Sequence, residues 1–271
     1  FTVTTLMHLY EQGLIDITAD VSQYLPFTLR NPRYPDIPIT IEMMMSHTSS
    51  INDSQGYYTS FDPINPAVSG DAVAKCYNEY APGQGYEYCN YNTNLLACVI
   101  ESVTGRRWDQ VVVETVLRSL DIYGGYCVDD LDRGRFATLY AWDGAKYVSQ
   151  PEAYARPAAL DNYRLCIDSP RLSAAGGMKI TATDLARYML MHMNYGKSPL
   201  ADERIISEES SRRMQTVLTD AIPDLPADAD HAGLGLMHST EFTPGIELVG
   251  HTGGAYGLRS AMFFDPEKKY G

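Results

Sequence analysis

Apolar residues recur at helical spacing through much of the first two thirds of the chain. Over residues 1–14, Val3, Leu6, Tyr10 and Leu14 follow one another at intervals of three or four residues, which is typical of one face of an amphipathic helix. Similar patterns, helped by threonines suited to N-caps, predict a short helix after Thr40 and helices over 69–79, 92–104, 108–120, 181–196 and 205–218. Residues 1–175 are therefore expected to form a mainly helical region.

The pattern changes near the C-terminal end. Three segments rich in apolar and β-branched residues predict successive antiparallel strands at 233–239, 247–254 and 258–264. A further hairpin is expected to turn at Asp143 and Gly144. Helices followed by strands indicate an α+β fold, an antiparallel sheet with flanking helices plus a helical domain, in which 176–271 is the helix-and-sheet region.

Composition narrows the classes of partner. The chain has 271 residues, of which 45% are hydrophobic, and its formal net charge is −13. That length and hydrophobicity suffice for a substantial core. Nucleic acids and anionic membranes attract clustered Lys and Arg, and the sequence has no basic patch, so no nucleic-acid partner is expected. No run approaches the roughly 18 apolar residues of a membrane-spanning helix.

Neither the cysteines nor the acidic residues form a metal-binding pattern. The 5 cysteines lack Cys-x-x-Cys spacing, so no zinc site is expected. Cys127 and Cys166 could pair in an oxidising compartment, and the sequence leaves this open. Asp224, Asp228 and Asp230 lack the glycine and terminal glutamate of a calcium loop and are read as a solvated acidic loop. We expect no metal and no organic cofactor.

Two short motifs indicate chemistry. Residues 88–90 read Tyr-Cys-Asn, and residues 251–254 read His-Thr-Gly-Gly at the start of an expected strand and turn. Alone, each has an ordinary explanation, as a tyrosine-rich loop with an Asx turn and as a strand-to-turn sequence. Together they resemble the second and third motifs of penicillin-recognising serine hydrolases, the family of class C β-lactamases and penicillin-binding proteins. The resemblance implies an α/β sandwich with a helical domain and an active site in the groove between them.

The resemblance assigns proton transfer and substrate orientation to the first of these motifs. Tyr88 would lie near the catalytic serine and lysine and shuttle a proton, provided that neighbouring cations lower its pKa. Asn90 would orient the lysine and the substrate amide or ester. Cys89 departs from the usual serine or alanine. His47, in a segment common in the family, is expected to have a structural role under the cleft.

The resemblance assigns substrate binding and oxyanion stabilisation to the second motif. A protonated His251 and the Thr252 hydroxyl would bind a substrate carboxylate. Gly253 would let the substrate approach the strand closely, and the Gly254 N–H would donate to the oxyanion. Histidine in place of lysine is commoner among peptidase-like and esterase-like relatives than among class C β-lactamases.

The Ser-x-x-Lys motif of the family occurs nowhere in the sequence. The first helical segment has no N-cap residue before it, and the resemblance places the serine about five residues before Phe1. The strand expected at 258–264 also lacks a return strand. We therefore expect an internal part of a longer serine hydrolase, inactive on its own.

That hydrolase would act through an acyl-serine on a D-Ala-D-Ala-type peptide, a β-lactam, another amide or an ester, in the periplasm or outside the cell. The alternative is a non-catalytic binding protein of the same fold that has lost its nucleophile.

Overall fold

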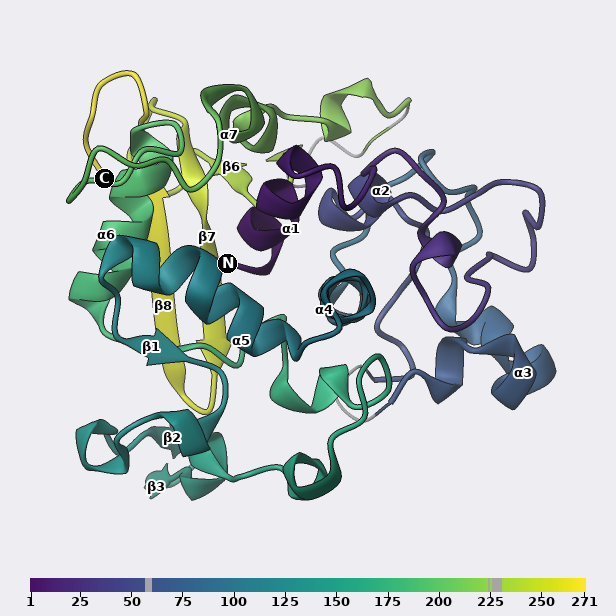
Figure 1. Cartoon of the computed structure of the whole chain (residues 1–271), viewed down its shortest axis with the longest axis horizontal. Helices are drawn as coiled ribbons and strands as arrows, with labels where there is room; N and C mark the ends of the chain where they lie inside the picture. Colours follow the sequence, from purple (N-terminus) through teal and green to yellow (C-terminus); the bar gives the residue numbers. More distant parts are fainter. Residues whose placement is uncertain (57–59, 224, 226–230) are drawn as a thin grey trace.

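The computed structural model describes residues 1–56, 60–223, 225 and 231–271, so the expected acidic loop of Asp224, Asp228 and Asp230 lies outside the described residues. Figure 1 shows two long strands on one side of the molecule, α2 and α3 on the other, and α1 and α4 between them. The helices are α1 (Thr2–Glu11), α2 (Ile41–Met45), α3 (Pro66–Ser69), α4 (Asn90–Thr104), α5 (Trp108–Val112), α6 (Ala182–Met193) and α7 (Glu208–Gln215).

The main sheet has four antiparallel strands in the order β5-β6-β7-β8. These strands are β5 (His231–Ala232), β6 (Met237–Ser239), β7 (Leu248–Ala255) and β8 (Leu258–Phe264). Directly paired residues share a face of the sheet, so His251, opposite Met262, lies on the same face as Phe264. Helix α6 covers this face, where the His192 and Phe264 rings stack with centroids 6.3 Å apart. The structure confirms the predicted α+β class.

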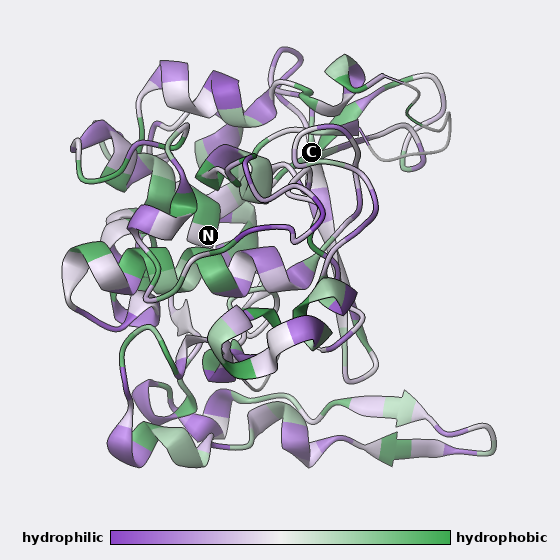
Figure 2. Ribbon diagram, turned by 90° about the vertical axis from the view of Figure 1, so that its right-hand side faces the viewer, coloured by the Kyte–Doolittle hydropathy of each residue, from purple (hydrophilic) through white to green (hydrophobic). Residues whose placement is uncertain are grey.

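The remaining strands form two small sheets. β2 (Tyr140–Trp142) and β3 (Tyr147–Ser149) make the hairpin predicted at Asp143 and Gly144, which extends as an arm at the bottom of Figure 2. β1 (Gly124–Gly125) pairs with β4 (Lys179–Ile180), a contact that the sequence did not predict. The proposed division at 175/176 stays a prediction, and this pairing joins the two regions.

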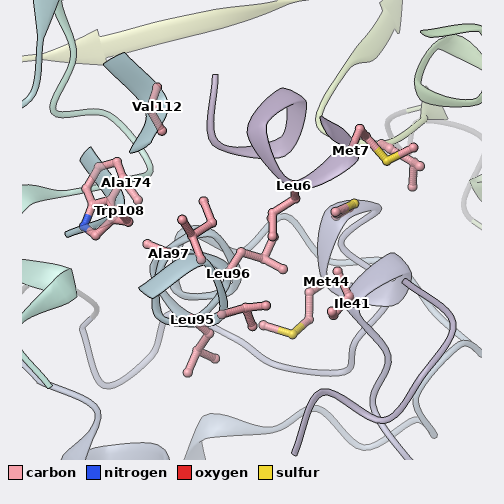
Figure 3. Close-up of a cluster of buried hydrophobic side chains, with 14 of the residues drawn as sticks. Leu6, Met7, Ile41, Met44, Leu95, Leu96, Ala97, Trp108, Val112 and Ala174 are labelled. Carbon is pink, nitrogen blue, oxygen red and sulfur yellow. The ribbon is translucent and has the colours of Figure 1, made fainter. Parts of the chain in front are cut away.

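The helical core is built around α4. Its side chains Leu95, Leu96 and Ala97 are buried, and they lie among the apolar faces of α1, α2 and α5 (Figure 3). Leu6 of α1 and Met44 of α2 are also almost fully buried in this cluster. Apolar burial on this scale is the main favourable term in folding, so α4 has a fixed position relative to its neighbours.

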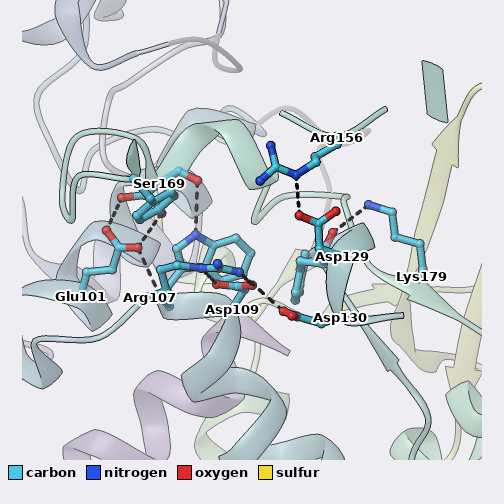
Figure 4. Close-up of polar contacts among 11 residues, drawn as sticks. Glu101, Arg107, Asp109, Asp129, Asp130, Arg156, Ser169 and Lys179 are labelled. Carbon is cyan, nitrogen blue, oxygen red and sulfur yellow. Dashed lines mark hydrogen bonds and ion pairs between the residues drawn. The ribbon is translucent and has the colours of Figure 1, made fainter. Parts of the chain in front are cut away.

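A buried carboxylate fixes the C-terminal half of α4. Glu101 accepts hydrogen bonds from the Ser169 hydroxyl at 2.7 Å and from the Tyr163 hydroxyl at 2.6 Å. Burial raises the pKa of this carboxyl group. The indole of Trp108 donates to the Ser169 carbonyl at 3.2 Å (Figure 4), which ties residues 163–169 to α4 and α5.

Several predicted elements differ in the structure. The segment predicted as a helix over 69–79 is α3 followed by a 3₁₀ helix at Gly70–Cys76. Residues 108–120 begin as α5 and continue as π and 3₁₀ turns to Leu120. Only residues 237–239 of the strand expected at 233–239 are extended in the sheet, because Gly235 has a positive φ of 65°.

The structure does not pair the two cysteines whose pairing the sequence left open. Cys166 lies against Cys98, with the Cys166 Sγ 3.5 Å from the Cys98 carbonyl oxygen and the Cys98 Sγ 3.5 Å from the Cys166 carbonyl. Cys127 and Cys166 are both free thiols. Spacing along the chain could not reveal this arrangement, because α4 brings Cys98 to the loop of Cys166.

Candidate functional site

The motif at residues 251–254 begins where β7 is no longer paired with β6 and is paired with β8 alone. β6 pairs with β7 only over Leu248–Gly250, whereas β8 pairs along the strand to Ala255. Among the described residues, the part of β7 from His251 onward therefore has a strand on one side only. Such an edge leaves backbone groups available to a ligand. We call residues 251–254 the β7 side of the site.

The motif at residues 88–90 lies across from these β7 residues, at the start of α4. Tyr88 precedes this helix and is 36% exposed. Its ring contacts two imidazoles, with its centroid 4.4 Å from that of His47 and 6.0 Å from that of His251. The structure thus brings Tyr88 and His251 together from segments far apart in the sequence. We call Tyr88 and Asn90 the α4 side of the site.

His47 packs against Tyr88 and is hydrogen-bonded to the motif at residues 88–90. Its Nδ1 accepts from the Cys89 backbone N–H at 3.2 Å, and its carbonyl accepts from the Glu87 N–H at 3.1 Å. Burial and the nearby His251 lower the pKa of His47 to about 4, so the ring is neutral at pH 7. These contacts fit the structural role expected of His47.

Asn90 is bound by a carboxylate that sequence reasoning missed. Asp53 Oδ2 accepts from the Asn90 backbone N–H and from its side-chain Nδ2, both at 2.9 Å. Asp53 Oδ1 accepts from the Tyr91 N–H at 2.9 Å and from the Cys89 thiol at 3.3 Å. No local signal marks this pairing, because the two partners lie on different segments.

A third contact joins the same two segments. The Ser49 hydroxyl donates to the Asn92 Oδ1 at 2.8 Å, and both side chains are fully buried. His47 thus binds residues 87 and 89, Ser49 binds residue 92, and Asp53 binds residues 89–91. We call residues 47–53 the supporting segment.

The β7 side is more open. Thr252, Gly253 and Gly254 are exposed, and His251 is half-buried. The His251 Nδ1 lies 2.5 Å from the Thr252 carbonyl oxygen, so this nitrogen carries a hydrogen and donates it to the carbonyl. A Cβ on Gly254 would lie 2.6 Å from Arg259 Nη1, which places a guanidinium beside this strand.

Two other features lie outside these motifs. Asp109, Cys127 and Asp130 form a cluster with the spacing of metal ligands, but the Arg107 guanidinium binds both carboxylates, Asp109 at 2.6 Å and Asp130 at 3.6 Å (Figure 4). A cavity of about 180 Å³ is lined by α2 and the segment around Leu218, and it includes neither motif. In the part of the chain that is described, no helix has the length and apolar character needed to span a bilayer.

The sequence matches the family model "Beta-lactamase" over residues 1–271. This chain belongs to the beta-lactamase family. The D-alanyl-D-alanine-carboxypeptidase/endopeptidase AmpH of Escherichia coli K12 is 26% identical over 100% of this chain and 66% of its own length. Penicillin-binding protein 4 of Amycolatopsis lactamdurans is 24% identical over 94% of this chain and 65% of its own length. The chain spans about two thirds of these relatives.

Solved structures show the same fold. The octameric penicillin-binding protein homologue of Pyrococcus abyssi superposes with a TM-score of 0.73 at 23% identity. The superposition covers 99% of this chain and 57% of the homologue. The D-amino acid amidase of Ochrobactrum anthropi gives a TM-score of 0.66 at 20% identity, with 98% of this chain and 71% of that one covered. The fold is therefore the β-lactamase/transpeptidase fold, as the sequence motifs implied.

Proposed function

We propose that the protein containing this chain is a serine hydrolase that cleaves amide or ester bonds through an acyl-serine intermediate. The observation that carries the proposal is the meeting of Tyr88 and His251, with ring centroids 6.0 Å apart, at an open strand edge. The family membership supports it. The serine and lysine of the Ser-x-x-Lys motif would come from outside these 271 residues, because no Ser-x-x-Lys occurs within them.

In the acylation step, the serine oxygen attacks the substrate carbonyl carbon while its proton passes to Tyr88 or the lysine. The oxyanion accepts from the Gly254 N–H and from the serine N–H. The bond to the leaving group then breaks, the leaving group takes the proton, and the acyl group stays on the serine. Water attacks the ester in the second step and releases the acid.

The residues of the β7 side would hold the substrate for this reaction. Thr252 offers a hydroxyl, and His251 offers a positive charge when protonated, to a carboxylate of the substrate. Gly253 lets an extended substrate lie close to β7. On the other side, Asn90 would orient the substrate amide or ester and the lysine. No metal or organic cofactor takes part in this scheme.

The substrate class that we favour is a peptide or amide containing a D-amino acid. AmpH is named as a D-alanyl-D-alanine carboxypeptidase, and two of the structural neighbours are named as a D-stereospecific amidohydrolase and a D-amino acid amidase. A β-lactam or a simple ester is the alternative within the same chemistry, because one fold hosts several such reactions. A periplasmic or extracellular site of action belongs to this proposal.

The deciding experiment is intact-protein mass spectrometry of the full-length protein after exposure to a fluorophosphonate and, separately, to a penicillin. We expect one adduct with the fluorophosphonate, lost when the upstream serine is changed to alanine. An additional penicillin adduct would favour the peptidase and β-lactamase branch over an esterase.

The isolated 271-residue chain is the control and should form no adduct. Labelling of this isolated chain would show that the nucleophile lies within these 271 residues and not outside them. Absence of any adduct on the full-length protein would contradict the proposal and favour a non-catalytic binding protein of the same fold.

A further inference from the structure

We infer that Asp53 is a positioning residue of the active site, which orients the Asn90 amide and the start of α4 so that Tyr88 and Asn90 face the substrate together. This inference rests on the proposed function. Four donors converge on its two carboxylate oxygens, from the Asn90 N–H, the Asn90 Nδ2, the Tyr91 N–H and the Cys89 thiol.

The start of α4 needs such a partner. The N-cap residue of this helix is Cys89, whose side chain makes no capping bond to the helix. The first N–H groups of a helix have no acceptor within it and carry a partial positive charge. Asp53 supplies both the acceptors and the opposite charge from a separate segment. The capping contact thus links residues 88–90 to the supporting segment rather than to their own loop.

The side-chain contact determines which end of the amide is presented. An asparagine amide has a donor end, Nδ2, and an acceptor end, Oδ1, which a rotation of about 180° would exchange. Because an ionised carboxylate can only accept, Asp53 selects the orientation in which Nδ2 faces it. The acceptor end is then directed away from Asp53. An acceptor is what a lysine ammonium or a substrate N–H requires.

The Cys89 thiol is a further donor to the Asp53 carboxylate. Burial and the nearby Asp53 raise the pKa of the Cys89 thiol well above its ordinary value, so the thiol stays protonated and donates. Cys89, which stands where the family usually has serine or alanine, thus has a role as a donor to the Asp53 carboxylate. His47 lies beside this group and fixes the Cys89 N–H, which leaves the Asn90 and Tyr91 N–H groups to Asp53.

The test compares Asp53→Asn with Asp20→Asn in the full-length protein. Asp20 is a matched control, because it also caps a helix, at the Ser22 N–H, and pairs with Arg30 outside the site. Both substitutions should lower Tm by roughly 2–4 °C as lost caps. Only Asp53→Asn should lower kcat, by about 10- to 100-fold, with KM changed by less than about 3-fold. Rates are normalised to the fraction of protein that a fluorophosphonate labels.

A double-mutant cycle separates positioning from stability. If Asp53 acts through Asn90, adding Asp53→Asn to Asn90→Ala should lower kcat/KM by less than about 3-fold further. Equal losses in both backgrounds would overturn the inference, as would an unchanged kcat for Asp53→Asn.

Crystal structures of the wild type and Asp53→Asn provide a readout that does not need activity. The Asn90 amide should rotate or leave its place in the variant, and an Asn90 in the wild-type position would overturn the inference. A wild-type protein that forms no adduct would contradict the proposed function, while the crystal structures would still decide the role of Asp53.

Discussion

The two sides of the candidate site are held in different ways. On the α4 side, Asn90 and the backbone around Tyr88 are fixed by hydrogen bonds from the supporting segment, and α4 itself runs through the buried core. On the β7 side, residues 252–254 are exposed and are held by pairing with β8. The side proposed for proton transfer is thus held by the supporting segment and a buried helix, whereas the strand edge proposed for substrate binding is accessible to solvent.

The largest expected effect concerns catalysis on the α4 side. Tyr88→Phe should lower kcat/KM of the full-length protein by about 10²–10⁴-fold, because the phenolic oxygen needed for proton transfer is removed. Tyr34→Phe is a matched control, since its hydroxyl bonds the Glu79 carbonyl outside both motifs. Steady-state kinetics with a D-amino acid amide would measure both. Equal activity of Tyr88→Phe and Tyr34→Phe would remove Tyr88 from the mechanism.

The second effect tests how far the α4 side depends on the core. The chain has 2 tryptophans, and Trp108 is 0% exposed whereas Trp142 is 58% exposed. Trp108→Ala should lower the free energy of unfolding by about 3–5 kcal/mol, because it leaves a cavity beside α4 and an unpaired Ser169 carbonyl. Trp142→Ala should change it by about 0.5 kcal/mol. Urea unfolding followed by circular dichroism would compare them, and similar losses would contradict the core assignment.

Substitutions at two glycines should distinguish the buried first half of β7 from its exposed second half. A Cβ on Gly250 would lie 1.8 Å from the Met262 carbonyl oxygen, so Gly250→Ala should destabilise the protein by about 2–3 kcal/mol. A Cβ on Gly254 would meet only the flexible end of Arg259, so Gly254→Ala should cost less than about 1 kcal/mol. Thermal unfolding would measure the difference. The opposite order would mean that the register of β7 and β8 is wrong.

The smallest effect is a dependence of stability on pH. Burial lowers the pKa of His47 to about 4 and that of His192 to about 3. Below the ordinary pKa of about 6.5 the unfolded chain binds protons that the folded chain does not, so stability falls as pH decreases. Between pH 7 and 5 each histidine should cost about 2 kcal/mol of unfolding free energy.

The variant His192→Gln isolates one of these two terms. Between pH 7 and 5, the free energy of unfolding of this variant should fall by about 2 kcal/mol less than that of the wild type. Urea unfolding at the two pH values would measure both. An identical pH dependence in the variant would show that His192 is not held neutral by burial.

Much of the fold follows from local patterns. The helical spacing around Leu6 predicted α1, and Thr40 and Thr181 cap α2 and α6 through their hydroxyls, as their sequence positions indicated. The paired strands β7 and β8 were also predicted. Patterns failed where a single glycine or a tight turn decided the backbone, as at residues 69–79 and 233–236.

The motif at 88–90 and the motif at 251–254 could be recognised because a reactive group and its neighbours are adjacent in the chain. The roles expected from these motifs stay predictions that the experiments above address; they concern Tyr88, Asn90, His251, Thr252, Gly253 and Gly254. Asp53 could not be found in this way, because all its donors lie on a distant segment and two of them are backbone N–H groups, which every sequence has.

The sequence by itself determined the family, the α+β class and the two motifs, because periodicity and short motifs are local properties of the chain. Only the tertiary structure decided that Tyr88 contacts both His47 and His251, that Asp53 holds Asn90, and that Cys166 lies against Cys98 rather than Cys127. These contacts join distant segments, and their geometry depends on how the whole core packs, which no local pattern records.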